Sequence, residues 1–145
     1  MGLAFYDAAK ELLSESSVLR TKHNGQLGGA HEQVFYLRND DPANYYVGLQ
    51  IGILSTDAYD ADGESGTSGW SFKFIYGERR PTEAEWDVVR SGESIALPDI
   101  GSTEAADMHT FHPIWLRVFV PGDTGAQYRT NYEVKLRGAT RKVGA

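Results

Sequence analysis

The sequence predicts an all-β fold, an Ig-like antiparallel β-sandwich of about six to seven strands with one short helical insert. Three observations support this prediction. Short segments rich in β-branched and aromatic residues recur along the chain. In the clearest of them, residues 45–54, apolar and polar side chains alternate as they do on a half-buried strand. Polar turns separate these segments, and the length of 145 residues suits one compact domain.

The turn at residues 38–44 (RNDDPAN) illustrates how the expected strands are delimited. Pro42 has no N–H for a ladder, and Asn and Asp favour turns. In the strand after it, the odd-numbered residues of 47–53 are expected to face the core. Tyr46 is expected on the opposite face, where Gly48 and Gly52 leave the strand flat enough for another backbone to approach. The expected strands are residues 33–38, 45–54, 70–77, 94–97, 112–122 and 131–137.

A single short helix is predicted between the third and fourth strands. Thr82 and Glu85 match the capping-box pattern, in which the Thr hydroxyl and the Glu carboxylate each accept a backbone N–H. Trp86 and Val89 supply one apolar face, and Gly92 is expected to end the helix after about two to three turns.

The two ends of the chain are expected to differ from the sandwich between them. Residues 1–27 are predicted to form an N-terminal arm or a short helix, because apolar residues between 8 and 13 have the spacing of an amphipathic helix. Residues 28–138 form the β-sandwich domain, and residues 139–145 form a C-terminal tail. Basic residues are concentrated toward this tail. A solvated face or a local contact to an acidic partner subunit would explain them.

Composition excludes several classes of function. The chain has no cysteine, so disulfides, zinc thiolate sites and thiol nucleophiles are absent. The formal charge of −6 argues against a broad nucleic-acid-binding face and against docking on anionic lipid. No run of apolar residues is long enough for a transmembrane helix, and the first residues do not resemble a signal peptide. We therefore expect no nucleic-acid or membrane partner and synthesis in the cytoplasm.

Neither a metal site nor a catalytic site is convincing in the sequence. Asp107, His109 and His112 lie close together in the sequence. A metal site usually needs a third protein ligand on rigid structure, and none is evident. The polar loop at residues 55–69 carries carboxylates that suggest calcium, but their spacing departs from that of an EF-hand. These carboxylates are Asp57, Asp60, Asp62 and Glu64. No nucleophile elbow, P-loop, dinucleotide fingerprint or zincin motif is present. The chain is therefore expected to be no enzyme and to hold no cofactor.

Three stretches carry a resemblance to a known class of proteins: residues 34–53 (VFYLRNDDPANYYVGLQIGI), 79–86 (RRPTEAEW) and 112–138 (HPIWLRVFVPGDTGAQYRTNYEVKLRG). Across residues 28–138 the chain resembles small accessory virion proteins of tailed bacteriophages, which are Ig-like β-sandwich subunits in capsid decoration, tail or baseplate positions. The resemblance implies a structural role in the virion after synthesis in the host cytoplasm. The implied partners are other virion proteins and copies of itself, in an oligomer within a larger assembly.

The contacts of such a subunit are expected at its two chain ends, with many weak contacts adding up by avidity. The expected interface residues are Phe5, Tyr6, Leu12, Leu13, Arg137, Arg141 and Lys142. A carbohydrate-binding module is the alternative, because sugar sites use exposed aromatic platforms. Its expected platform is Tyr59 and Trp70, with Tyr45, Tyr46 and Trp115 as further aromatic candidates.

Overall fold

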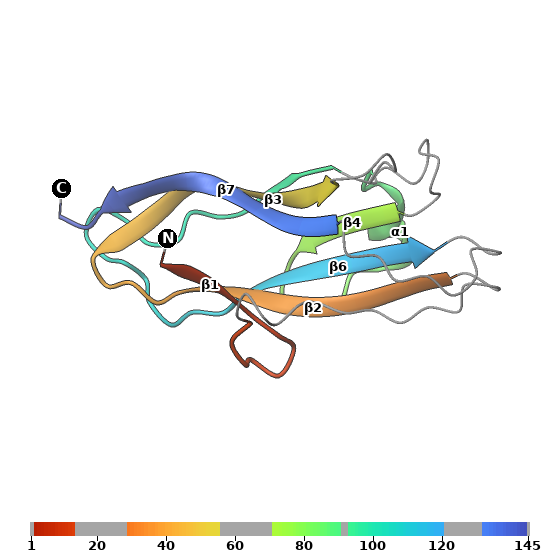
Figure 1. Cartoon of the computed structure of the whole chain (residues 1–145), viewed down its shortest axis with the longest axis horizontal. Coiled ribbons are helices and arrows are strands. Elements are labelled where there is room, and N and C mark those ends of the chain that lie inside the picture. Colours follow the sequence, from red (N-terminus) through yellow and green to blue (C-terminus); the bar gives the residue numbers. More distant parts are fainter. Residues whose placement is uncertain (1, 14–28, 56–70, 91–92, 121–131, 145) are drawn as a thin grey trace.

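The structure is a computed structural model that describes residues 2–13, 29–55, 71–90, 93–120 and 132–144. It has two layers of strands that run along the long axis of the molecule (Figure 1). The expected all-β sandwich is confirmed. The elements in these residues are β1 (Leu3–Tyr6), β2 (Gly29–Asn39), β3 (Asn44–Ser55), β4 (Ser71–Tyr76), α1 (Glu83–Asp87), β5 (Ile95–Ala96), β6 (His112–Val120) and β7 (Tyr132–Lys142).

The strands form two antiparallel sheets of different size. The larger sheet has the order β1-β2-β6-β4, and the smaller has the order β5-β3-β7. The order of the larger sheet corresponds to strands A, B, E and D of an immunoglobulin domain, and β3 and β7 take the places of strands C and F. An immunoglobulin domain carries strand G beside F. In the described part of this chain, no strand occupies the corresponding edge of β7.

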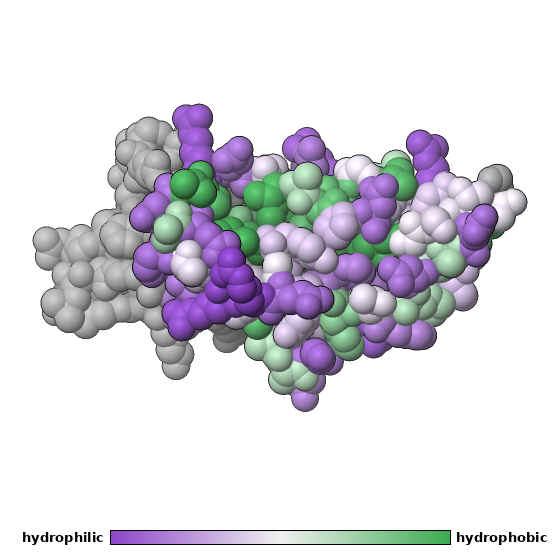
Figure 2. Space-filling model, turned by 180° about the vertical axis from the view of Figure 1, so that it is seen from behind, coloured by the Kyte–Doolittle hydropathy of each residue, from purple (hydrophilic) through white to green (hydrophobic). Residues whose placement is uncertain are grey.

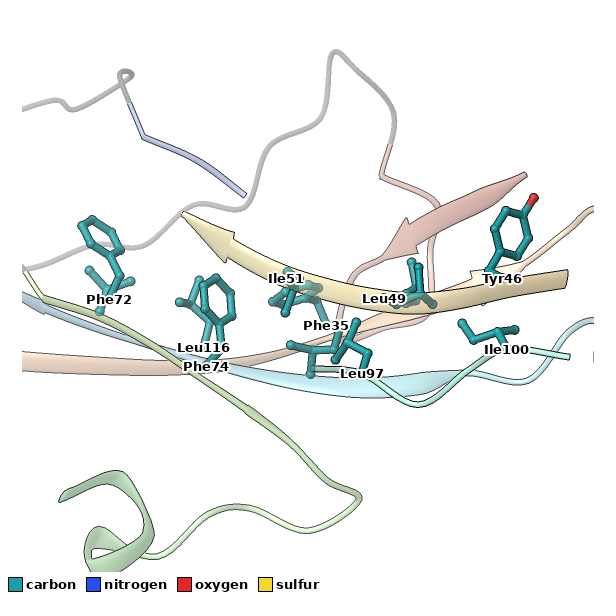
Figure 3. Packing of buried hydrophobic residues seen from close by; sticks show 12 residues of the cluster. Phe35, Tyr46, Leu49, Ile51, Phe72, Phe74, Leu97, Ile100 and Leu116 are labelled. Atoms are coloured by element: carbon teal, nitrogen blue, oxygen red, sulfur yellow. The ribbon is translucent and has the colours of Figure 1, made fainter. Parts of the chain in front are cut away.

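The core lies between the two sheets, where side chains from the inner faces interdigitate (Figure 3). The strand expected at residues 112–122 corresponds to β6, in which every second residue, Ile114, Leu116 and Val118, is buried. Phe35 of β2 contacts Phe74 of β4 edge to face, with ring centroids 6.5 Å apart. Each fully buried side chain of this size contributes roughly 1.5–3 kcal/mol through removal of apolar surface from water.

A β-bulge in β3 changes which side chains face the core. The register with β7 shifts between Val47 and Gln50, and Gly48 has a φ of +62°. As a result Tyr46 and Leu49 are both buried, at 0% and 1% exposure, although they are three positions apart. The predicted outward position of Tyr46 is therefore wrong. A strict period of two does not hold across an inserted residue.

Helix α1 begins where the capping box predicted. Thr82 Oγ1 accepts the N–H of Glu85 at 3.3 Å, and Glu85 Oε1 accepts the N–H of Thr82 at 3.1 Å. The helix is shorter than expected and ends at Asp87, before Gly92. Its only buried side chain is Trp86, whereas Val88 is 85% exposed. The apolar face is thus too short to support another turn.

Helix α1 is attached to the outer face of the larger sheet. Lys73 of β4 donates to the Trp86 carbonyl at 3.3 Å, and the Arg117 guanidinium of β6 lies 5.8 Å from the Trp86 ring centroid. Arg117 also binds both carboxylate oxygens of Glu83, at 2.8 and 3.1 Å. Trp86 therefore forms a second apolar contact on the side of the sheet that faces away from the main core.

The N-terminal segment departs from the expected arm or helix. Leu3–Tyr6 form β1, which pairs antiparallel with β2. Asp7 Oδ1 then accepts the N–H groups of Ala9 and Glu11, both at 2.9 Å. An Asp side chain that holds backbone N–H groups in a turn competes with helix formation, which explains the error. Residues 14–28 lie outside the described part of the chain.

The C-terminal segment is also more regular than predicted. Strand β7 extends to Lys142, and Ala139 to Lys142 pair with Val47 to Asn44 of β3. Residues 139–142, expected as part of a tail, are therefore integral to the smaller sheet. The bulge in β3 permits this extension, because β7 resumes its pairing with β3 beyond the shifted register.

Gly138 lies opposite the bulge and tests how tightly the two strands fit. A Cβ at this position would be 2.6 Å from Leu49 Cδ2 and 3.2 Å from the Val47 carbonyl oxygen. We expect Gly138→Ala to lower the free energy of unfolding by about 1–3 kcal/mol through overpacking. Gly77→Ala is the control, because nothing lies within 4 Å of its Cβ position. Equal denaturation midpoints for the two variants would contradict this prediction.

The burial of Trp86 gives a second prediction, in which the same helix supplies the control. We expect Trp86→Ala to destabilise the protein by about 3–5 kcal/mol, because it removes a large side chain and leaves a cavity. Val88→Ala, two residues away, should change stability by less than about 0.5 kcal/mol, because this side chain is exposed. Urea denaturation of both variants measures the difference. A small effect of Trp86→Ala would mean that α1 does not contribute to global stability.

Candidate functional site

The open edge of β7 is the candidate functional site. β7 has 11 residues and is bonded on one side to β3. The other strands at sheet edges are shorter: β4 has 6 residues, β1 has 4 and β5 has 2. A strand with one neighbour leaves a row of backbone N–H and C=O groups free to bind another strand. β7 borders the upper layer on the side that faces the reader in Figure 1.

Four exposed cations line this strand without compensation. They are Lys135, Arg137, Arg141 and Lys142. None of them forms an ion pair within 4 Å with a carboxylate in the described part of the chain. Their cross-strand partners on β3 are all neutral: Gly52, Gln50, Tyr45 and Asn44. A local positive charge therefore remains on a protein whose formal charge is −6.

The cations near the larger sheet behave differently, because they are used inside the fold. Arg38 Nε lies 2.6 Å from Asp40 Oδ1, and Arg79 Nη1 lies 2.7 Å from Glu85 Oε1. Arg80 pairs with Glu32 at 2.9 Å. Arg117 pairs with Glu83 and lies 3.8 Å from Glu32. This contrast singles out β7 as a strand whose cations have no ion-pair partner among the described residues.

A second polar cluster joins β1 to β2 and to the connection before β6. The Tyr6 hydroxyl donates to Asp40 Oδ2, and the Arg38 guanidinium lies 4.4 Å from the Tyr6 ring centroid and 5.1 Å from that of Phe111. Lys10 lies 5.1 Å from the Phe111 centroid. Each cation and the carboxylate already has a partner in the cluster, so its chemistry stabilises the fold.

The same contacts shift the pKa values of Asp40 and Tyr6. Burial of Asp40 favours its protonated form, but hydrogen bonds from Tyr6 and Arg38 outweigh burial and hold the pKa of Asp40 below its ordinary value. Burial, reinforced by the hydrogen bond to Asp40, raises the pKa of Tyr6. Asp40 therefore stays ionised at neutral pH, and Tyr6 stays protonated.

Asn39 is a buried polar residue that sequence reasoning did not find. Its side chain is fully buried and donates to the carbonyls of Ala106 at 2.7 Å and Asn44 at 3.1 Å. Its Oδ1 accepts the N–H of Asp41 at 2.8 Å, and its backbone carbonyl accepts the N–H of His109 at 3.1 Å. Asn39 thus fixes both the turn after β2 and the connection before β6. The sequence around Asn39 predicts a turn, and Asn is common in turns, so the sequence did not indicate this buried role.

The expected interface residues separate into two groups. Phe5 and Tyr6 serve the interior: Phe5 packs 5.6 Å from Phe35, and Tyr6 is only 6% exposed. Their role in an interface stays a prediction, but the segment that carries them is a strand of the larger sheet and not an arm. Leu12 is 58% exposed and Leu13 is half-buried. Arg137, Arg141 and Lys142 all lie exposed on β7, where the structure brings them together with Lys135.

The aromatic candidates for a sugar platform do not form one surface in the described residues. Tyr59 and Trp70 lie outside the described part of the chain. Tyr46 is buried, and its hydroxyl accepts the N–H of Gly2 at 2.8 Å. Trp115 Nε1 donates to the Gly77 carbonyl at 2.9 Å. The Tyr45 hydroxyl lies 3.3 Å from that of Thr103.

The suggested metal ligands do not converge. His112 Nδ1 lies 3.3 Å from the Tyr76 hydroxyl, whereas His109 Nδ1 lies 4.0 Å from Asp40. Asp107 accepts a hydrogen bond from Thr110. Within the described ranges, no group of three potential ligands is arranged to hold a metal ion. The carboxylates of the suggested calcium loop, residues 57–64, lie outside those ranges.

The face opposite to that of Figure 1 carries hydrophobic side chains in an interrupted band between hydrophilic ones (Figure 2). Among the described residues, the large hydrophobic side chains that are exposed are Leu12 and Val88, which belong to distant segments. Isolated exposed side chains of this kind are normal on a protein surface. The free edge of β7 is therefore a better candidate for docking than an apolar patch.

Comparisons with known proteins do not assign the chain to a family. No family model matches, and neither a curated protein nor a solved structure matches the chain. None of the described helices is long and apolar enough to cross a membrane.

The lowered pKa of Asp40 predicts a pH-dependent contribution to stability. A carboxyl group with a depressed pKa in the folded state stabilises the fold above its unfolded-state pKa of about 3.9, and the contribution is lost as pH falls through the folded pKa. We expect Asp40→Asn to cost about 0.5–1.5 kcal/mol at neutral pH and much less at about pH 2. Denaturation at both pH values measures this.

The control for this measurement is Glu104→Gln, which changes an exposed carboxylate with no side-chain partner in the described residues. It should leave stability nearly unchanged at both pH values. If the cost of Asp40→Asn were the same at both pH values, the carboxylate charge would not be what stabilises the cluster.

Proposed function

We propose that this chain is a non-enzymatic structural subunit of a tailed-phage particle, in a capsid-decoration (cement), tail or baseplate position. The observation that carries the proposal is the basic edge of β7, which has no second neighbour strand and no compensating carboxylate in the described residues, whereas Arg38, Arg80 and Arg117 form ion pairs within the fold. The resemblance of residues 34–53, 79–86 and 112–138 to accessory virion proteins supplies the class of particle.

The attachment is ascribed to β7 and not to the first residues of the chain. Residues 3–6 are a strand of the larger sheet and bind Phe35 and the rest of the core. Their removal would damage the fold before it could affect assembly. β7, in contrast, offers one row of backbone groups and exposed cations that have no partner in the described part of the chain. Its partners would be neighbouring virion proteins and other copies of this chain.

A particle with many copies of the subunit makes this mode of attachment effective. Each contact can be weak, because several contacts held in a fixed geometry raise the effective concentration of the next. The two-layer body holds the edge of β7 in a fixed orientation, because β7 pairs with β3 along its length. Charge at the edge steers the approach of an acidic partner surface.

The proposal predicts incorporation of the chain into purified phage particles, measured by quantitative mass spectrometry. Arg137→Glu reverses a charge on β7 and should reduce incorporation about tenfold, because the loss is multiplied over repeated contacts. Arg90→Glu is the matched control, since Arg90 is also exposed and has no ion-pair partner in the described residues. Absence of the wild-type chain from particles would contradict the proposed function.

A further inference from the structure

We propose that the edge of β7 binds an extended segment of a partner protein in which acidic and apolar residues alternate. The segment would lie as an added strand in the place that strand G takes in an immunoglobulin domain. In this mode of recognition, backbone hydrogen bonds to the edge supply affinity and side chains at alternate positions supply specificity. The inference rests on the proposed function, because it names the chemistry of the partner that the edge of β7 would bind.

The edge of β7 differs from the edge at β1 of the other sheet. Strand β1 is covered by the segment that follows it, because Leu12 forms a β-bridge with Tyr6 and Leu13 donates its N–H to the Phe5 carbonyl at 2.8 Å. β7 has 11 residues, and β3 is its one neighbour among the described strands. A long row of backbone groups on β7 is therefore placed to pair with a strand from another molecule.

The side chains of β7 divide between an apolar and a cationic face. Val134 and Leu136 pack against the core but are only half-buried. Lys135 and Arg137 alternate with them, so they point to the opposite face, where both are exposed. Arg141 is an even number of positions further along and is exposed as well. A strand laid beside β7 would thus have apolar neighbours on one face and cations on the other.

The apolar face of an added strand would meet a side of the core that is incompletely covered. β4 contacts both β3 and β5, so β7 lies over the opposite border of the larger sheet, which β1 forms. Leu3 and Phe5 of β1 also pack against the core and are also half-buried. Apolar side chains placed between these two borders would be removed from water, which favours binding.

The charges of β7 select an acidic partner and oppose a second copy at the same edge. On β3, the residues opposite Lys135 and Arg137 are Gly52 and Gln50, which carry no charge. Opposite charges on adjacent strands stabilise pairing and like charges oppose it. Two β7 edges would therefore repel each other, whereas a strand with carboxylates on its outward face would be attracted. A segment of about eight residues would reach from Val134 to Arg141.

Three synthetic peptides of eight residues, each acetylated, amidated and labelled with fluorescein, test the chemistry of the partner. EVEVEVEV alternates acidic and apolar residues. EEVVEEVV has the same composition and charge without the alternation, and KVKVKVKV has the opposite charge. Fluorescence anisotropy with the full chain at about 20 mM salt measures binding. We expect EVEVEVEV to bind the wild type at least about tenfold more tightly than either other peptide, and more weakly at about 500 mM salt.

An edge variant and a charge-matched control test the site on the protein. The edge variant carries Lys135→Gln, Arg137→Gln and Arg141→Gln. The control variant carries Arg79→Gln, Arg80→Gln and Arg90→Gln. We expect the edge variant to bind EVEVEVEV about tenfold more weakly than the wild type and the control variant to bind it nearly as well. Circular dichroism melting checks the fold of both variants, and the three-peptide comparison needs the wild type alone.

Hydrogen exchange of the β7 amides distinguishes an added strand from a contact through charge alone. In an antiparallel ladder every second residue directs its N–H toward the same neighbour. The N–H groups of β7 that point away from β3 should exchange rapidly in the chain alone. With saturating EVEVEVEV their exchange should slow by about tenfold or more, because they then form hydrogen bonds.

Several results would overturn the inference. Equal binding of EVEVEVEV and EEVVEEVV, without slower exchange in β7, would mean that the cations attract any acidic chain. Slow exchange of the same amides before peptide is added would mean that the chain covers this edge itself. Binding of KVKVKVKV, or self-association of the wild type that EVEVEVEV does not reverse, would also contradict it. Absence of the chain from phage particles, with specific binding of EVEVEVEV intact, would instead overturn the proposed function alone.

Discussion

The pairing of β3 with β7 across the bulge is the constraint on which the rest of this structure depends. In the described residues β7 has β3 as its single neighbour, so the register of this pair decides which β7 side chains face the core. The bulge turns both Tyr46 and Leu49 inward. Tyr46 in turn binds the backbone of Gly2, which ties the smaller sheet to the start of β1 in the larger one.

The distribution of charge follows from the same arrangement. Cations near the larger sheet find carboxylates on the neighbouring strand, on helix α1 or in the turn after β2, as Arg117 and Arg38 show. The cations of β7 have neutral residues of β3 on one side, and on the other side the described part of the chain places no strand. A charge that is compensated inside a fold stabilises that fold, whereas an uncompensated charge on a free edge is available to a partner. This difference makes the edge of β7 the candidate surface for a partner.

Local patterns predicted the elements that local physics decides. The capping box located the start of α1 because its two hydrogen bonds involve residues only three positions apart. Segments rich in β-branched and aromatic residues located β4 and β6, and the buried residues of each strand alternate because one face is toward the core. The Asp7 turn and the bulge at Gly48 escaped prediction. One depends on a side chain that competes for backbone groups, and the other on the fit of β3 to a strand more than 80 residues later in the chain.

The sequence by itself determined the fold class, the turn after β2, the helix cap and the concentration of basic residues near the C-terminus. Each of these depends on periodicity, on backbone restrictions or on contacts between near neighbours. Only the tertiary structure decided that Phe5 and Tyr6 belong to the interior, that Asn39 anchors the connection before β6, and that the basic residues line a free edge. Those outcomes depend on which strands become neighbours, and pairing between distant segments is set by the packing of the whole core.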